Sequence, residues 1–514
     1  MSNARTEVYD PLELSVLSHG VSMIAEEMGA VLVRSALSPN IRERRDASSA
    51  VFDRDGRMIA QAAHIPVHLG AMPESVAAVR ARDPRPGDVF LLNDPYHGGS
   101  HLPDLTLVEA VDIDGVVGGY TAVRAHHADV GGMSPGSMPQ GATELVQEGL
   151  IVPPIRLVRA GVLDADLLAL ILANVRTPEE RRGDLGAQLA ACAIGAAGWR
   201  ALAARLGMAR LDAACDALLD YAERRVRARL APLEGRMGYA KDCLEGDGLT
   251  DTDIVVVVTL RVEKGTLHLD FTGSAPQVAG NVNCPAAVTR AAAVFALRTL
   301  LDDDVPTNDG IARALSFVLP ARSAVNAAWP AAVAAGNVEM SQRVADTILA
   351  AFGDAGIDVA AQGQGTMNNV TFGGAGWTFY ETLGGGQGGS TRGPGPSGVH
   401  VGMSNTLNTP VESLERSTPL RIERYALRDG SRGGGANPGG EGIVRAYRAT
   451  TSCTVTLLTE RRRHAPRGLA GGGDGAPGRN LLNDTPLPAK CRVALRAGDV
   501  VTIETPGGGG HGIR

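Results

Sequence analysis

Apolar positions in the first quarter of the chain change from a helical to a strand period. From residue 11 to residue 38 they recur every three or four positions, and a proline then stops the pattern, so we expect one long amphipathic helix. Two short apolar runs flank Asp55-Gly56, a typical hairpin turn. Two further strands are expected between residues 87 and 124, joined at Asp114-Gly115. Sheet structure therefore follows the first helix.

The middle of the chain has a different composition. From Asp164 to Leu233 alanine, leucine, arginine and glutamate dominate with hardly a glycine turn, which predicts three or four packed helices. After Gly248 alternating and β-branched stretches return, as at 253–258. Many of the 65 glycines lie in the C-terminal half, in short runs between short strands. This last part reads as irregular β structure.

A chain of 514 residues is too long for one hydrophobic core. We expect an α+β fold with several domains. Residues 1–160 form a mixed α/β domain with the candidate site, 161–245 a helical block, and 246–514 a mixed, glycine-rich β domain. No internal repeat is found.

Composition and charge exclude some classes of protein and of binding partner. The net charge is −7 and the longest basic cluster is Arg461–Arg463, which argues against a nucleic-acid partner. The N-terminus lacks a signal-peptide pattern, and no run of about 18 apolar residues occurs. We therefore expect a cytoplasmic protein that does not span a membrane. The six cysteines are widely spaced without a CxxC pair, so we expect them to be buried apolar residues.

The polar residues are richest in two neighbouring segments, 93–104 and 126–132. Four of the eleven histidines fall within 31 residues there. Prolines and glycines in the first segment exclude a helix, so His97 and His101 do not share a helical face as in HExxH zinc enzymes. The geometry must come from a loop and a hairpin.

Hairpin register predicts which of these residues meet. Counting back from a two-residue turn at Asp114-Gly115 sets Asp104 opposite Ala125 and Pro103 opposite His126. His101, Asp104 and His126 then converge at the open end of the hairpin.

Two imidazoles and a carboxylate are a common ligand set for zinc, manganese or iron. A bound cation would lower the pKa of a water and polarise a substrate oxygen, as hydrolysis or carbonyl activation requires. The alternative is that these histidines only stabilise the fold by hydrogen bonds. Asp129 is the further catalytic candidate, in the supporting role of orienting a ligand histidine.

Other candidates carry weaker signals. Asp94 is expected to cap its Asn-Asp-Pro turn. His64 and His68 either line the same cavity or are structural. Asp184 follows a run of charges that reads as a solvated helix face.

The sequence gives no support for a nucleotide-binding site or for a reactive cysteine. No GxxxxGK[ST] phosphate loop occurs and the chain has only three lysines, so we expect no nucleotide-binding residues here. No cysteine lies in a plausible reactive motif, so covalent catalysis through a thiol finds no support.

The strings Asn93-Asp94-Pro95-Tyr96-His97-Gly98-Gly99-Ser100-His101-Leu102-Pro103-Asp104 and Ala125-His126-His127-Ala128-Asp129-Val130-Gly131-Gly132 resemble the hydantoinase B/oxoprolinase family, the B-type subunits of N-methylhydantoinases. The likeness runs nearly from end to end. Further matching segments are 38–46, 65–72, 148–150, 280–285, 336–339, 381–386, 405–415 and 505–510.

The resemblance implies a subunit that works with a larger A-type partner, as a hetero-oligomer such as α2β2. The partner binds ATP and phosphorylates a cyclic amide or an enolisable carbonyl oxygen. On this subunit a metal-bound water then opens the ring of a hydantoin, 5-oxoproline or related lactam. The family's metal site maps onto His101, Asp104 and His126, with an acidic residue matching Glu43 as fourth ligand.

Two positions depart from the family pattern. Gly402 stands where a second histidine is common, in a GVHTHM-like segment, and His511 stands where tyrosine is common. Our leading hypothesis is the metal-binding B-type subunit of an ATP-dependent cyclic amidohydrolase. The alternatives are a subunit of an ATP-dependent ketone carboxylase and a non-catalytic scaffold. The sequence does not identify the substrate ring, the metal or the stoichiometry.

Overall fold

The computed structural model describes residues 9–514, which form a mixed α+β fold with four β-sheets, as predicted. The first sheet has seven strands in the order β2-β1-β5-β4-β3-β6-β7. Its strands are β1 (Ala47–Phe52), β2 (Met58–Ala63), β3 (Val89–Leu92), β4 (Asp104–Ile113), β5 (Val116–His126), β6 (Ile155–Arg159) and β7 (Val162–Leu163). The candidate site residues of the sequence lie at the ends of β4 and β5.

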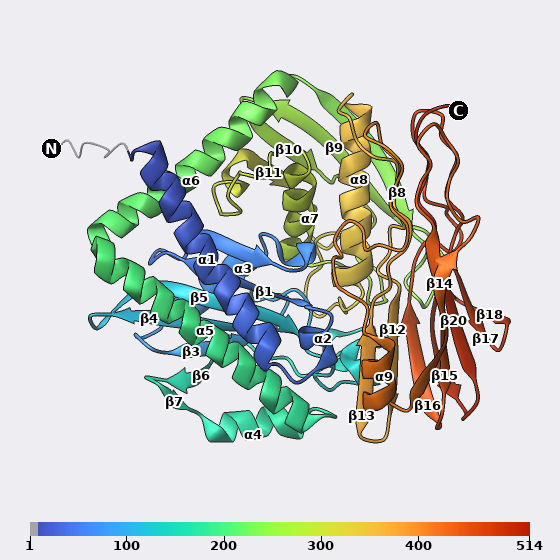
Figure 1. Cartoon of the computed structure of the whole chain (residues 1–514), viewed down its shortest axis with the longest axis horizontal. Coiled ribbons are helices and arrows are strands. Elements are labelled where there is room, and N and C mark those ends of the chain that lie inside the picture. Colours follow the sequence, from blue (N-terminus) through green and yellow to red (C-terminus); the bar gives the residue numbers. More distant parts are fainter. Residues whose placement is uncertain (1–8) are drawn as a thin grey trace.

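Helices cover both faces of this sheet. On one face α1 (Pro11–Ser35) and α5 (Pro178–Leu206) lie side by side over the strands (Figure 1). On the other, α3 (Met72–Arg80) packs its apolar side against Phe52 and Phe90. The remaining helices of this part are α2 (Pro39–Arg42), α4 (Ala165–Ala173) and α6 (Met208–Leu230). The long helix predicted from residue 11 and the predicted helical block are thus confirmed.

The helical block shares one hydrophobic core with the first sheet. Trp199 of α5 is buried, and its Nε1 donates to the Gly118 carbonyl oxygen of β5 at 3.0 Å. A Cβ at Gly119 would lie 2.3 Å from that nitrogen, so only glycine allows this approach. The expected division at residues 160 and 245 remains a prediction.

Both α1 and α5 are long and apolar enough to cross a membrane by length and composition. Core helices of soluble proteins pass the same test, because they too carry a wide apolar face. Here the two helices bury part of that face against each other and against the sheet.

A second layer follows the helical block. The sheet β11-β10-β9-β8 packs against α7 and α8 around the largest apolar core (Figure 1). The elements are β8 (Met237–Leu244), β9 (Ile254–Glu263), β10 (Thr266–Asp270), β11 (Leu315–Val318), α7 (Ala286–Arg298) and α8 (Ser341–Asp354). A π-helix at Gly336–Met340 leads directly into α8.

Two sheets of the C-terminal part pack on each other at one end of the molecule (Figure 1). One has the order β13-β12-β16-β19 and the other β14-β15-β20-β17-β18. Their elements are β12 (Asn369–Gly374), β13 (Trp377–Glu381), α9 (Val411–Ser417), β14 (Leu420–Arg428), β15 (Gly442–Ala449), β16 (Cys453–Leu458), β17 (Arg479–Leu482), β18 (Thr485–Leu487), β19 (Lys490–Leu495) and β20 (Val500–Glu504). The predicted glycine-rich β structure is confirmed.

The hairpin of β4 and β5 corrects the predicted register. Its turn is as expected, with φ of 53° at Asp114 and 82° at Gly115, the positive values that a type I′ turn requires. Farther along, Gly118 and Gly119 of β5 together oppose Val111 of β4, which is a β-bulge. The extra residue shifts the ladder by one, so that Asp104 pairs directly with His126.

The prediction that Asp184 lies on a solvated helix face was wrong. This residue is fully buried, and its Oδ1 accepts hydrogen bonds from the backbone nitrogens of Leu37 (2.9 Å) and Ser38 (3.0 Å). Its Oδ2 lies 3.0 Å from the buried Arg181 guanidinium. The neighbouring Glu179 is solvated, with 85% of its side chain exposed. Asp184 thus ties α5 to the chain that leaves α1.

We expect Asp184→Ala to lower the free energy of unfolding by about 3 kcal/mol, because it removes one of the two carboxylates paired with the buried Arg181 and leaves two backbone donors without partners. Urea denaturation measures this. Glu179→Ala, one turn away and exposed, is the matched control and should change the free energy by less than about 0.5 kcal/mol. A loss below about 1 kcal/mol for Asp184→Ala would contradict the structural role.

Candidate metal centre

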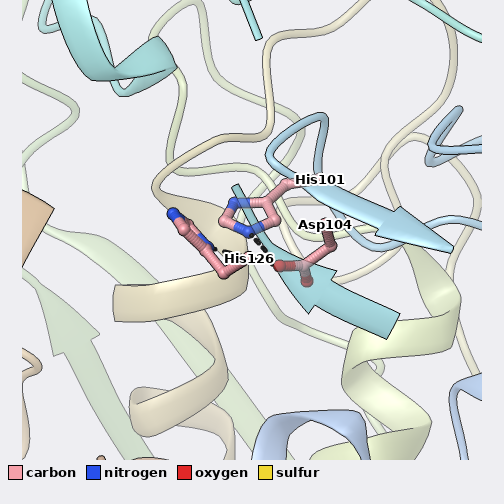
Figure 2. A group of neighbouring side chains, drawn as sticks. All are labelled: His101, Asp104 and His126. Atoms are coloured by element: carbon pink, nitrogen blue, oxygen red, sulfur yellow. Dashed lines mark ion pairs between the residues drawn. The ribbon is translucent and has the colours of Figure 1, made fainter. Parts of the chain in front are cut away.

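Asp104, His101 and His126 meet at the open end of the β4–β5 hairpin. Asp104 begins β4, His126 ends β5, and His101 lies in the turn before β4. Figure 2 shows both imidazoles directed at the carboxylate. Asp104 Oδ1 lies 3.0 Å from His101 Nε2 and 3.3 Å from His126 Nδ1. All three side chains are buried, so water does not solvate this group.

The second oxygen of Asp104 is occupied by neighbours. Oδ2 accepts from Ser100 Oγ at 2.5 Å and from Asn337 Nδ2 at 3.4 Å. His68 Nε2 lies 3.3 Å away, while its Nδ1 is 3.0 Å from Ser48 Oγ. These contacts fix the orientation of the carboxylate and leave Oδ1 to face the histidines.

A backbone carbonyl on the far side of the ring fixes the orientation of His101. Its Nδ1 lies 3.2 Å from the carbonyl oxygen of Ala334, which accepts only, so this nitrogen carries the proton. In the neutral ring Nε2 then carries a lone pair and no proton. That lone pair faces Asp104 Oδ1, itself an acceptor.

Three buried atoms at this point have no hydrogen-bond partner among the described residues: His101 Nε2, Asp104 Oδ1 and His126 Nε2. Two acceptors 3.0 Å apart repel each other unless a proton or a cation lies between or beside them. Two imidazole nitrogens and a carboxylate oxygen match the ligands of zinc and similar divalent cations. The residues present therefore fit a metal ion.

Burial and neighbouring charges shift the pKa of each of the three groups. Burial opposes ionisation of Asp104, but His101 and His68 outweigh it and hold the pKa of the carboxyl well below its ordinary value. Burial lowers the pKa of His126 and leaves its ring neutral. For His101, burial is outweighed by Asp104 and the pKa is raised. A cation at Asp104 would replace the proton that this pair attracts.

The C-terminal part of the chain completes the site. Tyr380 of β13 stacks on His126, with ring centroids 4.5 Å apart and planes 13° from parallel. Its hydroxyl donates to Asn369 Oδ1 at 2.8 Å, and Asn369 Nδ2 donates to Glu339 Oε1 at 2.9 Å. Arg44 lies over the Tyr380 ring, 5.0 Å from its centroid. The plane of His126 is thus set by a chain of contacts that runs to the π-helix.

The π-helix Gly336–Met340 supplies two of these polar groups. Asn337 reaches Asp104, and Glu339 reaches Asn369. A Cβ at Gly336 would lie 1.7 Å from the Asn283 carbonyl oxygen, which requires glycine where the π-helix begins. A π-turn inside a helix re-aims side chains, and such turns are frequent at functional sites.

Two of the expected site residues lie apart from the group. Glu43 ends α2 and its carboxylate pairs with Arg42 at 3.1 Å. Asp129 accepts from the backbone nitrogens of Gly131 and Gly136 and pairs with Arg176 at 2.9 Å. No histidine contacts Asp129 in the described part of the chain, so its position fits a loop anchor and corrects the orienting role.

The other histidines divide between the centre and the scaffold. His68 contacts Asp104, whereas a Cβ at Gly29 would lie 2.7 Å from His64 Nε2, so His64 fills space beside α1. His127 Nε2 lies 2.8 Å from Gln188 Oε1, and burial lowers its pKa to about 4.

The predicted cap is confirmed. Asp94 Oδ1 accepts from the Tyr96 nitrogen at 2.9 Å, and Asp94 Oδ2 lies 2.7 Å from Nδ1 of the exposed His97. His97 therefore faces solvent and does not join the centre.

Sequence reasoning missed Asp46 and Glu148. Asp46 is buried, its carbonyl oxygen accepts from the His126 backbone nitrogen at 3.0 Å, and its charge opposes the pKa-lowering effect of burial on both His101 and His126. Glu148 accepts from the backbone nitrogens of Val333 and Ala334, and burial raises its pKa to about 8. The signal in the sequence for a role of these two residues was that they lie in segments 38–46 and 148–150, which resemble the family.

Five of the six cysteines are buried, as expected, and all six are free. Cys243 is half-buried and forms a second group with Asp253 and His464. Arg463 already binds the Asp253 carboxylate at 2.7 Å, and burial raises the pKa of the thiol to about 11. Both facts disfavour a cation there.

Comparison with known proteins places this site in a family context. A sequence profile described as hydantoinase B/oxoprolinase matches residues 10–514. 5-oxoprolinase 1 of Arabidopsis thaliana is 38% identical over 98% of this chain, which spans 42% of that protein. A putative B-type subunit of the D-/L-hydantoinase from a Pseudomonas strain is 29% identical over 100% of this chain and 92% of its own. The crystal structure of the ATP-dependent caprolactamase of Pseudomonas jessenii matches with a TM-score of 0.91, 26% identity, and coverage of 98% of this chain and 92% of that one.

The buried carboxyl of Glu339 should make the stability of the protein depend on pH. Burial, followed by the charge of Glu460, raises its pKa from 4.5 to about 8. Below about pH 4.5 the carboxyl is protonated in both the folded and the unfolded chain. As the pH rises towards 8 the unfolded chain ionises first, so the free energy of unfolding falls, by up to about 1.4 kcal/mol per pH unit.

Glu339→Gln removes that loss while keeping an amide oxygen for the same donors. We expect the variant to gain stability over wild type progressively from pH 5 to pH 8 in urea denaturation. Glu412→Gln, exposed on α9, is the matched control. A constant difference between variant and wild type across this range would contradict the assignment.

Proposed function

The chain belongs to the hydantoinase B/oxoprolinase family, and from this we propose that it is the metal-binding B-type subunit of an ATP-dependent cyclic amidohydrolase. Its reaction is the hydrolytic ring opening of a cyclic amide that a partner subunit has phosphorylated. The substrate class is that of its relatives' names: hydantoins, 5-oxoproline and lactams.

One observation carries the proposal: His101 Nε2 and Asp104 Oδ1 face each other at 3.0 Å, both buried and without a hydrogen-bond partner within residues 9–514. Without a proton or a cation beside them such a pair costs free energy. The scaffold alternative requires a proton on His101 Nε2, whereas a bound cation would satisfy both histidines and the carboxylate. A divalent cation, with zinc first and manganese or iron next, would polarise the amide carbonyl and lower the pKa of a bound water.

The chain's own residues prepare that chemistry. Ser100, His68 and Asn337 hold Asp104 so that Oδ1 stays directed at the histidines. The carbonyl oxygen of Ala334 keeps the proton of His101 on Nδ1. Tyr380 covers one face of His126 and excludes water from that side. Asp46, and Glu43 in the alternative, supplies further negative charge for the cation.

The family and its B-type hydantoinase relative support an ATP-binding partner for this chain. The chain has no phosphate-binding GxxxxGK[ST] loop. It spans about two fifths of the 5-oxoprolinases that it matches, including those of Dictyostelium discoideum and Saccharomyces cerevisiae. We propose that an A-type chain binds ATP, that the two form a cytoplasmic hetero-oligomer such as α2β2, and that the activated amide is hydrolysed at Asp104.

Metal content tests the site directly. We expect the full chain, loaded with zinc or manganese and desalted, to retain about one ion, and His101→Ala and Asp104→Ala to lose it while keeping their circular dichroism spectra. His97→Ala is the matched control, because His97 is exposed nearby and should leave the metal content unchanged. Wild-type chain that stays empty with both metals would favour the scaffold alternative.

Activity tests the reaction. With its A-type partner and ATP, the wild-type chain should release ADP and a ring-opened acid from one of hydantoin, 5-oxoproline or caprolactam. We expect His101→Ala to abolish ring opening and Asn337→Ala to lower kcat by about 10–100-fold, as for groups that orient metal ligands. Ring opening undiminished in His101→Ala would exclude the assigned role. Incorporation of labelled bicarbonate would instead support the carboxylase alternative.

A further inference from the structure

A cavity of about 730 Å³ lies outside the metal centre, between the second sheet and the C-terminal loops. One wall comes from β8, α7 and α8, and the other from three loops at residues 358–363, 387–392 and 467–469. Its volume is that of a site for a small organic molecule. Neither the metal centre nor the proposed hydrolysis uses these residues.

The lining combines apolar area with free positive charge. Phe295, Leu349, Val359 and Leu469 contribute half-buried apolar side chains. At the mouth stand three exposed cations, Lys241, Arg392 and Arg467. Lys241 and Arg392 have no side-chain partner within residues 9–514, and Lys241 is one of only three lysines in the chain.

The carboxylates of the cavity, in contrast, are engaged. Asp346 Oδ2 lies 3.1 Å from Arg461, Asp354 accepts from the Tyr239 nitrogen at 2.9 Å, and Asp358 accepts from Thr391 Oγ1 at 2.6 Å.

Behind the cavity lining, the carboxylate of Asp242 is paired with arginines. Asp242 Oδ2 lies within 3.4 Å of three guanidinium groups. They belong to Arg343, Arg461 and Arg467. Burial raises the pKa of Asp346 to about 7, which reduces the negative charge inside near neutral pH. A ligand entering this space therefore meets an apolar floor and unpaired cations.

We propose that this cavity is a second binding site, for a small carboxylic acid with an apolar chain. The carboxylate pairs with Lys241 and Arg392 at the mouth, and the chain lies on Phe295, Leu349 and Val359. Guanidinium and ammonium groups bind carboxylates by charge-assisted hydrogen bonds, and the apolar lining adds the hydrophobic contribution.

The inner wall of the cavity is connected to the metal centre. Gln342 Nε2 donates to the Val401 carbonyl oxygen at 2.9 Å, and the Met403 nitrogen donates to Gln342 Oε1 at 3.1 Å. The Val67 nitrogen donates to the Met403 carbonyl oxygen at 3.2 Å, and the next residue, His68, contacts Asp104. Ring opening of a lactam yields an amino acid, which shares the carboxylate of this ligand class; this link rests on the proposed function, whereas the site itself does not.

Gly402 keeps this wall open. Its φ is 61°, and a Cβ there would lie 2.2 Å from Gln342 Oε1. A larger residue at this position would displace the glutamine that holds the loop.

Calorimetric titration of the full, chelator-treated chain with hexanoate tests the site without turnover or metal. We expect saturable binding to wild type, weakened at least about tenfold in Lys241→Met/Arg392→Gln. Arg492→Gln, exposed on β19, is the matched control and should bind as wild type does. Hexanamide, of the same shape without the charge, should bind at least about tenfold more weakly than hexanoate.

A second variant fills the cavity without changing its charge. Ala350→Phe, on the cavity side of α8, should also abolish binding. Equal affinity for hexanoate and hexanamide, or unchanged hexanoate affinity in the double variant, would overturn the proposal. Because the titration uses metal-free chain, its failure is distinct from failure of the hydrolytic role.

Discussion

The buried negative charge of Asp104 is the constraint on which the rest of this structure depends. A carboxylate removed from water is tolerated only when both oxygens have partners. Three neighbours satisfy Oδ2, and two histidines face Oδ1. Asp104 thus presents one oxygen to two imidazoles, an arrangement that fits the proposed cation site.

No single segment of the chain builds this environment. The hairpin of the first sheet supplies Asp104 and His126, the π-helix supplies Asn337, and β13 of the C-terminal part supplies Tyr380. Residues more than 230 positions apart in sequence meet around one carboxylate. Glycines and the π-helix therefore have the same structural effect: they allow segments from separate layers to pack closely at the end of one hairpin.

The same packing separates two kinds of binding environment. The metal centre is dry, compact and lined by oriented donors, as suits a polarising site. The second cavity is larger, with an apolar floor and flexible cations at its mouth, as suits recognition of a small acid. The loop 401–403 belongs to the wall of the cavity and, through Val67 and His68, to the support of Asp104. The proposed metal site and the proposed acid site are thereby connected through one loop.

The sequence by itself determined the elements and the identity of the three central residues. Helical and strand periods gave α1, both early hairpins and the helical block, and the Asp114-Gly115 turn brought Asp104 near His126. The register was wrong by one residue, because Gly118 and Gly119 of β5 form a bulge opposite Val111, and the position of a bulge is decided by the pairing of two strands. Asp184 was read as solvated because burial of a charge depends on a partner chain segment, here the backbone at residues 37–38. Tertiary structure alone decided which groups surround Asp104, since Asn337, Tyr380 and Asp46 reach the site through long-range contacts that local patterns do not encode.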